Sequence, residues 1–191
     1  MAIKQTQQPR RPRIGVTLGD TAGIGPELAA KLLSNSANVR NAEVLLFADH
    51  SEVEQACADA GGVTIDSSVK IMHDGTASNQ AIVRQQASQA GGERCLYQFK
   101  RCLKMAKAGD LDAIVFAPLN KSSLKKAGMT EEDELRWFAK QLNYAGTTSE
   151  INVAGQLWTG RVTSHIGIEK VASMINKDSV LKAIQLVHRL R

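Results

Sequence analysis

Short apolar runs rich in β-branched residues alternate along this chain with segments of helical periodicity, and this alternation restricts the fold more than any other feature. The run 113–117 (Ala-Ile-Val-Phe-Ala) is apolar without alternation, which is typical of a strand covered on both faces, as in a parallel sheet. Strands that alternate with helices favour a layered α/β fold with right-handed crossovers. The runs that we predict as strands are Arg13–Leu18, Val44–Ala48, Val63–Ile65, Val69–Met72 and Ala113–Ala117.

Helical patterns fill the segments between these runs. Pro26–Leu33 begins with proline at a first-turn position, and Ser51–Ala60 begins with a capping residue and ends before two glycines. The other predicted helices are about 77–108 (one helix, or two interrupted near Gly91-Gly92), 122–127, 131–142 with Thr130 as its cap, and two that close the chain. The last of these has Asp178 as its cap and a buried stripe formed by Val180, Leu181, Ile184, Val187 and His188. Residues 151–165 are predicted to be β-like.

Basic residues are concentrated at the amino end of the chain. Lys4, Arg10, Arg11 and Arg13 supply four positive charges against a formal net charge of +5, and the first 13 residues contain no acid. We predict a disordered basic tail over residues 1–12 and an α/β body over residues 13–191. The alternative is a nucleic-acid-binding arm, but no stripe of Lys and Arg with interleaved aromatic residues follows it. We therefore expect no nucleic-acid partner.

The sequence also predicts a cytoplasmic protein. No apolar run approaches the roughly 20 residues needed to cross a bilayer, and the start lacks the apolar core of a secretory signal. Cys95 and Cys102 are placed on one helix about 10 Å apart, which is too far for a disulfide. With Cys57 they are expected to be free thiols in a reducing compartment.

The strongest local motif is the nonapeptide at residues 19–27, Gly-Asp-Thr-Ala-Gly-Ile-Gly-Pro-Glu, which follows a predicted strand and opens a helix. Gly19, Gly23 and Gly25 allow close backbone approach, and a helix amino end favours an anion. The spacing is neither that of a dinucleotide fingerprint nor that of a nucleotide-hydrolase phosphate loop. Two interpretations remain open: an anion site that includes Asp20, or a tight turn that serves close packing.

This nonapeptide resembles the amino-terminal signature of the 4-hydroxythreonine-4-phosphate dehydrogenase family, which works in pyridoxal phosphate biosynthesis. Thr21 stands where the family typically has proline. The segment 117–121 (Ala-Pro-Leu-Asn-Lys) with Ala127-Gly128 resembles the family's Gly-Pro-Val-His-Lys and the Ala-Gly that follows it. Thr163-Ser164-His165-Ile166 resembles the family's Thr-Thr-His-Leu. The order and spacing agree, so the resemblance covers nearly everything after residue 12.

The resemblance implies a three-layer α/β/α fold like that of isocitrate and isopropylmalate dehydrogenases, and a homodimer. It also implies an NAD-dependent oxidation of a secondary alcohol, followed by decarboxylation, with a divalent metal (Zn, Mg or Co). In the family three histidines hold the metal, and His165 matches the first. The other two lie in motifs of the type Asn-Pro-His-Ala and Tyr-His-Asp-Gln-Gly, which this sequence lacks; His50, His73 and His188 fit neither.

Substrate contacts depart from the family pattern. The family has a His-Thr pair about a dozen residues beyond the lysine that matches Lys121, and Glu134 and Leu135 occupy those positions here. Most of the acidic run 131–134 is explained as a solvated helix start. A carboxylate in place of a hydrogen-bond donor is nevertheless unfavourable for a phosphate ester. Lys121, placed just past a strand's carboxyl end, is the remaining cation that could bind a substrate anion.

These observations predict a family dehydrogenase acting on 4-phosphohydroxy-L-threonine, present here as a fragment or variant. A helix that ends the chain in an open sheet, at Arg191, favours an incomplete fold. One alternative is the same fold acting on a sugar-acid phosphate or an aromatic dihydrodiol acid. Others are a non-catalytic remnant, or an anion-binding module built on Gly19–Gly25.

Overall fold

The structure is a computed structural model that describes residues 10–76 and 82–190. The chain divides into two compact units, unit 1 within residues 1–130 and unit 2 within residues 131–191. In the described ranges, none of the helices combines the length and the apolar character needed to cross a membrane.

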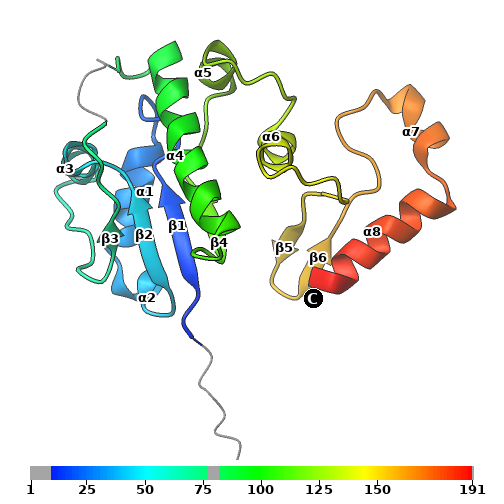
Figure 1. Ribbon diagram of the computed structural model, residues 1–191, viewed down its shortest axis with the longest axis horizontal. Helices are drawn as coiled ribbons and strands as arrows, with labels where there is room; N and C mark the ends of the chain where they lie inside the picture. The colour runs from blue at the N-terminus through cyan, green and yellow to red at the C-terminus, as the bar shows by residue number, and fades with distance from the viewer. Residues whose placement is uncertain (1–9, 77–81, 191) are drawn as a thin grey trace, which may run out of the picture. The chain divides into compact units, whose positions relative to one another are not determined.

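Unit 1 is built around a parallel four-stranded sheet with the order β3-β2-β1-β4 (Figure 1). The strands are β1 (Arg13–Thr17), β2 (Glu43–Phe47), β3 (Lys70–Ile71) and β4 (Ala113–Phe116). In the central pair, Arg13 is opposite Glu43 and Thr17 is opposite Phe47. The helices are α1 (Gly25–Leu33), α2 (Ser36–Val39), α3 (His50–Asp59), α4 (Gln89–Lys107) and α5 (Lys121–Lys126).

Helices cover both faces of this sheet, which gives three layers. On one face, side chains of β1 and β2 pack against α1 and α3, with Val16, Leu46 and Leu33 among the buried residues. On the other face, Leu45 and Phe47 of β2 pack against Cys102 of α4. The predicted three-layer α/β/α architecture is therefore confirmed in unit 1. The parallel β1–β2 and β1–β4 pairs also explain why these strands are apolar without strict alternation.

Side-chain caps fix where the helices of unit 1 begin. The Asp49 carboxylate and Glu52 form a reciprocal capping box at α3. The Ser88 hydroxyl accepts a hydrogen bond from the amide of Gly91, so α4 starts at Gln89 and not near residue 77 as predicted. Residues 77–81 of the predicted helix lie outside the described residues. The two glycines near its start do not interrupt α4, because Gly92 packs closely against α5: a Cβ there would lie 2.0 Å from the Ser123 carbonyl oxygen.

Three strand predictions need correction. Val63–Ile65 is not a strand; Val63 and Ile65 instead pack as irregular chain against a small alanine cluster that includes Ala30 and Ala56. β3 has only two residues. The run 113–117 forms β4, but it is not covered on both faces: Val115 and Phe116 are 44% and 40% exposed. β4 is an edge strand of the described sheet, which accounts for this exposure.

The amino-terminal prediction also needs correction at its boundary. Residues 1–9 lie outside the described residues, but Arg10 and Arg11, which were assigned to the disordered tail, are held in place. The Arg10 guanidinium donates to both carboxylate oxygens of Asp112, at 2.9 and 2.7 Å. Arg11 donates to the carbonyl oxygens of Val39, Arg40 and Ala42. These basic side chains are therefore used to fasten the chain to the start of the sheet.

The three cysteines are free thiols, as predicted. Cys95 is buried, and Cys102 is fully buried in the core beneath α4. Burial disfavours the thiolate and raises the pKa of Cys102 to about 12. Cys102 therefore serves packing, not nucleophilic chemistry.

Unit 2 contains a short antiparallel hairpin and three helices. The strands β5 (Asn152–Ala154) and β6 (Leu157–Thr159) pair with Asn152 opposite Thr159. The helices are α6 (Glu134–Gln141), α7 (Ile168–Met174) and α8 (Lys177–Leu190). The β-like prediction for 151–165 is confirmed for the hairpin only; the part from Arg161 to Thr163 is not a strand.

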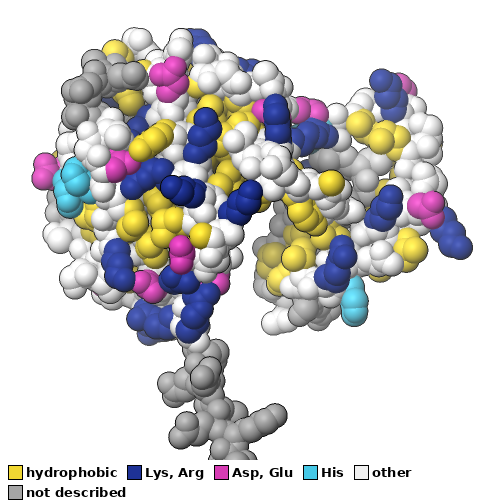
Figure 2. Space-filling model, in the orientation of Figure 1, with side chains coloured by type: hydrophobic (Ala, Val, Ile, Leu, Met, Phe, Trp, Pro, Cys, Tyr) yellow, Lys and Arg dark blue, Asp and Glu magenta, His cyan; other side chains and the backbone are white. Residues whose placement is uncertain are grey.

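Two details of unit 2 contradict the sequence predictions. Asp133, not Thr130, caps α6, and Asn176 exchanges hydrogen bonds with Ser179 at the start of α8, where Asp178 had been predicted to cap. The apolar stripe of α8 is not buried: Leu181 and Ile184 are 45% and 60% exposed, because the elements of unit 2 cover this helix only in part. Figure 2 shows hydrophobic side chains at the surface among scattered charged ones.

Candidate functional site

The glycine-rich turn after β1 is a densely packed junction. Gly19 has φ +68°, and a Cβ there would lie 2.4 and 2.5 Å from the carbonyl oxygens of Ala117 and Pro118. The amide of Asp20 donates to the Pro118 carbonyl oxygen at 2.9 Å. At Gly25 a Cβ would lie 2.2 Å from the Leu18 carbonyl oxygen. Only glycine fits at both positions, and the turn thereby joins the carboxyl ends of β1 and β4.

Asp20 closes the same turn from within. Its carboxylate is buried and accepts a hydrogen bond from the amide of Ala22, and its carbonyl oxygen accepts one from Gly23. An anion placed here would meet this carboxylate in a site of low dielectric constant. Of the two interpretations that the sequence left open, the geometry favours the packing turn over an anion or dinucleotide cradle.

Lys121 lies at the first position of α5, just beyond the carboxyl end of β4, as predicted. The Asn120 side chain caps this helix by accepting a hydrogen bond from the amide of Ser123 at 3.2 Å. The Lys121 side chain is exposed. Its position at the carboxyl edge of the sheet suits a residue that meets a ligand, but unit 1 alone brings no other predicted site residue except those of the Gly19–Gly25 turn to this edge.

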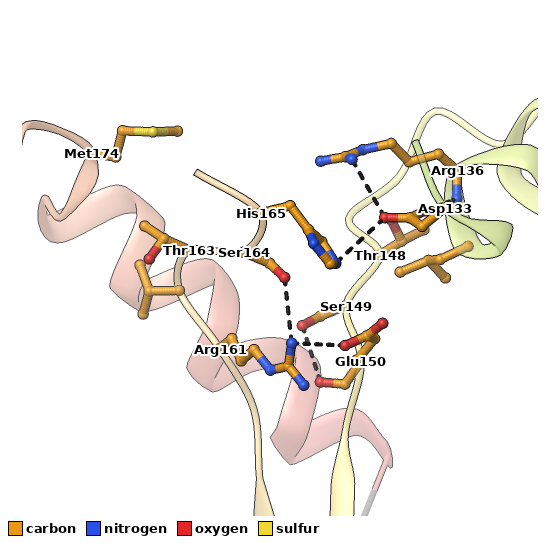
Figure 3. Close-up of a pocket in the computed structure, with 12 residues that line it drawn as sticks. Asp133, Arg136, Thr148, Ser149, Glu150, Arg161, Thr163, Ser164, His165 and Met174 are labelled. Carbon is orange, nitrogen blue, oxygen red and sulfur yellow. Dashed lines mark hydrogen bonds and ion pairs between the residues drawn. The ribbon is translucent and has the colours of Figure 1, made fainter. Parts of the chain in front are cut away.

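His165 lies in a separate pocket of unit 2 with a volume of about 250 Å³. Its backbone has φ +56°, an unusual conformation for a residue other than glycine or asparagine and one that recurs at functional sites. Its side chain is 39% exposed, and its Nε2 lies 3.9 Å from Oδ2 of Asp133 (Figure 3). Hydroxyl groups of Thr148, Ser149, Thr163 and Ser164 belong to residues that line the same pocket.

The start of α6 forms one wall of this pocket. The Asp133 carboxylate caps the helix through the amide of Arg136 at 2.8 Å and also faces the Arg136 guanidinium at 3.3 Å. Leu135 lines the pocket, and Glu134, the first residue of α6, is half-buried beside it. The positions predicted from the family's His-Thr pair thus lie next to His165, within unit 2.

Sequence reasoning missed the second charged pair of the pocket. Arg161 Nη1 lies 2.8 Å from a carboxylate oxygen of Glu150 and 3.4 Å from the Ser164 hydroxyl. A signal was present: Arg161, Thr163 and His165 are spaced by two residues, which places alternate side chains of an extended segment on one side. Two arginines and two carboxylates leave the pocket close to electrically neutral.

The described residues do not by themselves form a metal centre. Across 10–76 and 82–190, no three His, Cys, Asp or Glu side chains come together to hold a metal ion. The pocket offers one imidazole, His165, and one nearby carboxylate, Asp133, whereas protein zinc sites use three or four protein ligands. His50 and His73 stack on each other in unit 1, and His188 lines a different cavity on α8.

Comparison with known proteins decides the family. Residues 27–190 match the family described as pyridoxal phosphate biosynthetic protein PdxA. The chain belongs to the PdxA family. A provisionally named 4-hydroxythreonine-4-phosphate dehydrogenase 2 from Pseudomonas aeruginosa is 37% identical over 94% of this chain. The D-threonate 4-phosphate dehydrogenase of Bordetella bronchiseptica is 28% identical over 93% of it.

Solved PdxA-family structures share this fold. The crystal structure of a 4-hydroxythreonine-4-phosphate dehydrogenase from Burkholderia phymatum superposes with a TM-score of 0.79, at 27% identity, over 93% of this chain. The chain spans 57% of that protein, 57% of the Pseudomonas relative and 54% of the Bordetella relative. The partial coverage agrees with the metal ligands: the chain has the position of one family histidine and lacks the motifs of the other two.

Proposed function

We propose that this chain forms part of an NAD- and divalent-metal-dependent dehydrogenase that oxidises a secondary alcohol of a small hydroxy acid, with decarboxylation. The preferred substrate is 4-phosphohydroxy-L-threonine, in pyridoxal phosphate biosynthesis, and the active form is a homodimer. The observation that supports this most is the PdxA-family match over residues 27–190 together with the position of His165 in a polar pocket.

The pocket supplies binding and orientation. Its volume of about 250 Å³ suits a small polar molecule, and four hydroxyl-bearing side chains can donate or accept hydrogen bonds within it. His165 would contribute one imidazole to a metal site. That site needs at least one further ligand beyond His165 and Asp133, so it is completed by groups outside the described residues.

A second candidate keeps the family chemistry and changes the substrate. Asp133 and Glu134 bring two carboxylates to the position where the family has a His-Thr pair. Two like unit charges 4 Å apart repel by about 4 kcal/mol at an effective dielectric constant of 20, which disfavours a phosphate dianion. Among the described residues only Nη1 of Arg161 has a partner, so its Nε–Nη2 edge remains available to a substrate carboxylate. These features favour a hydroxy acid without a phosphate, such as an aromatic dihydrodiol acid.

A chimera tests both candidates. Residues 1–190 of this chain are joined to the part of the Pseudomonas aeruginosa relative that has no counterpart here, and NADH formation is measured with Mg²⁺ or Co²⁺. We expect turnover of 4-phosphohydroxy-L-threonine, or of a cis-dihydrodiol acid if the second candidate holds, and none from the 191-residue chain alone. His165→Ala should abolish turnover, whereas His188→Ala, in another cavity, should leave it nearly unchanged. A folded chimera that is inactive on these substrates and on D-threonate 4-phosphate would refute the proposal.

A further inference from the structure

A small closed cavity lies in unit 1 where the end of β1, the glycine-rich turn and α4 meet. Its volume is about 10 Å³, and its walls include Thr17, Thr21, Gln98, Glu52 and Arg94. It belongs to neither the His165 pocket nor the sheet edge near Lys121. A cavity of this size admits roughly one water molecule and excludes anything larger.

Three buried polar atoms in the walls of this cavity have no hydrogen-bond partner among the described residues. They are the Thr17 hydroxyl, the Thr21 hydroxyl and Nε2 of Gln98. Thr17 is 1% exposed and Gln98 is 5% exposed, so bulk water does not satisfy them. The other side-chain atom of Gln98, Oε1, accepts a hydrogen bond from Arg101 at 3.0 Å, which fixes the amide with its nitrogen left over. Buried polar groups in folded proteins are almost always paired, with ordered water where protein atoms do not suffice.

We propose that this cavity binds one structural water molecule that joins Thr17, Thr21 and Gln98. The amide of Gln98 donates to the water oxygen, and the two threonine hydroxyls, which can donate or accept, complete its hydrogen bonds. Three polar partners lie within the usual range for a buried water. An additional cation is disfavoured because the Gln98 amide presents hydrogen atoms and because Glu52 in the wall is already neutralised by Arg94 at 2.5 Å.

The water would hold the glycine-rich turn in place. Thr17 belongs to β1, Thr21 to the turn and Gln98 to α4, so one molecule links three elements. This gives a physical role to Thr21, which stands where the family signature typically has proline, a residue without a side-chain donor. The inference does not depend on the proposed dehydrogenase function.

Isosteric substitution tests the water through the sign of its effect. Thr17→Val and Thr21→Val replace a hydroxyl with a methyl group of the same size, and Thr64→Val makes the same change at an exposed position. If a bound water satisfies the hydroxyl, each buried change should raise the unfolding equilibrium constant roughly fivefold in urea titrations, and the double variant should lose less than the sum. If the hydroxyl is unsatisfied, removing it should instead stabilise the protein, which would overturn the proposal.

Oxygen-17 magnetic relaxation dispersion of the full chain provides an independent measurement that does not rely on stability. The number of long-lived internal waters should fall by one from the wild type to Thr17→Val and stay unchanged in Thr64→Val. An equal count in wild type and Thr17→Val would contradict the proposal even if both proteins are folded.

Discussion

Replacing Gly19 with alanine is expected to destabilise unit 1 by about 3 kcal/mol or more. The left-handed conformation at φ +68° costs a residue with a Cβ about 1–2 kcal/mol, and the forced overlap with two carbonyl oxygens adds roughly 1–3 kcal/mol. Those oxygens belong to the backbone of Ala117 and Pro118, so no side chain can rotate away to relieve the contact. Urea unfolding of the full chain measures the loss.

Gly109→Ala is the matched control. Gly109 has φ +79°, but nothing lies within 4 Å of the position where its Cβ would be. It should therefore show the conformational cost alone, about 1 kcal/mol. Equal losses at Gly19 and Gly109 would mean that the close approach between the turn and the end of β4 does not fix the turn.

Removing the buried guanidinium of Arg94 is expected to destabilise the protein by about 3–5 kcal/mol. The Arg94 side chain is 8% exposed and donates through Nε and Nη2 to the two carboxylate oxygens of Glu52, at 2.8 and 2.5 Å. A third bond, from Nη1, reaches the Thr76 hydroxyl at 2.8 Å. Arg94→Met leaves the Glu52 and Asp49 carboxylates buried without this charge, and thermal or urea unfolding reports the loss.

Two further variants identify the cause. Arg84→Met breaks an ion pair of similar length with Asp59 at the surface and should change stability little, because solvent screens that pair. Adding Glu52→Gln to Arg94→Met should recover part of the stability, since the buried carboxylate is neutralised while an oxygen remains to accept the bond from the amide of Asp49. An Arg94→Met loss no larger than that of Arg84→Met would contradict this explanation.

The sequence predicted the parts of the fold that depend on local pattern. β1 and β2 were found because buried parallel strands are continuously apolar, and α3 because Asp49 and Glu52 form a cap at its start. Val63–Ile65 has the same composition as a strand, yet it packs as irregular chain against the alanine cluster between α1 and α3. Glycine near the start of α4 suggested a break, but the close approach to α5 requires it. Such tertiary contacts are not visible in a local pattern.

The candidate site was predictable only in part, and for a similar reason. His165 was found through its motif, and the turn around Asp20 through its glycines. The partners of His165 come from segments about 11 to 32 residues away, Glu150 and Asp133, and only folding brings them together. The acidic run at 131–134 was interpreted as a helix start, which is correct for Asp133, but the same carboxylate also faces the imidazole. One residue serving two roles is not evident from composition.

Calorimetric titration of the 191-residue chain with Mg²⁺ and Co²⁺ tests the central claim most directly, namely that this chain carries a single imidazole of the family's metal site. The account predicts no binding in the submicromolar range, because His165 and Asp133 are the only donors that the described pocket brings near each other. A stoichiometric submicromolar site that is lost in His165→Ala would contradict it, since further ligands would then have to join His165 within this chain.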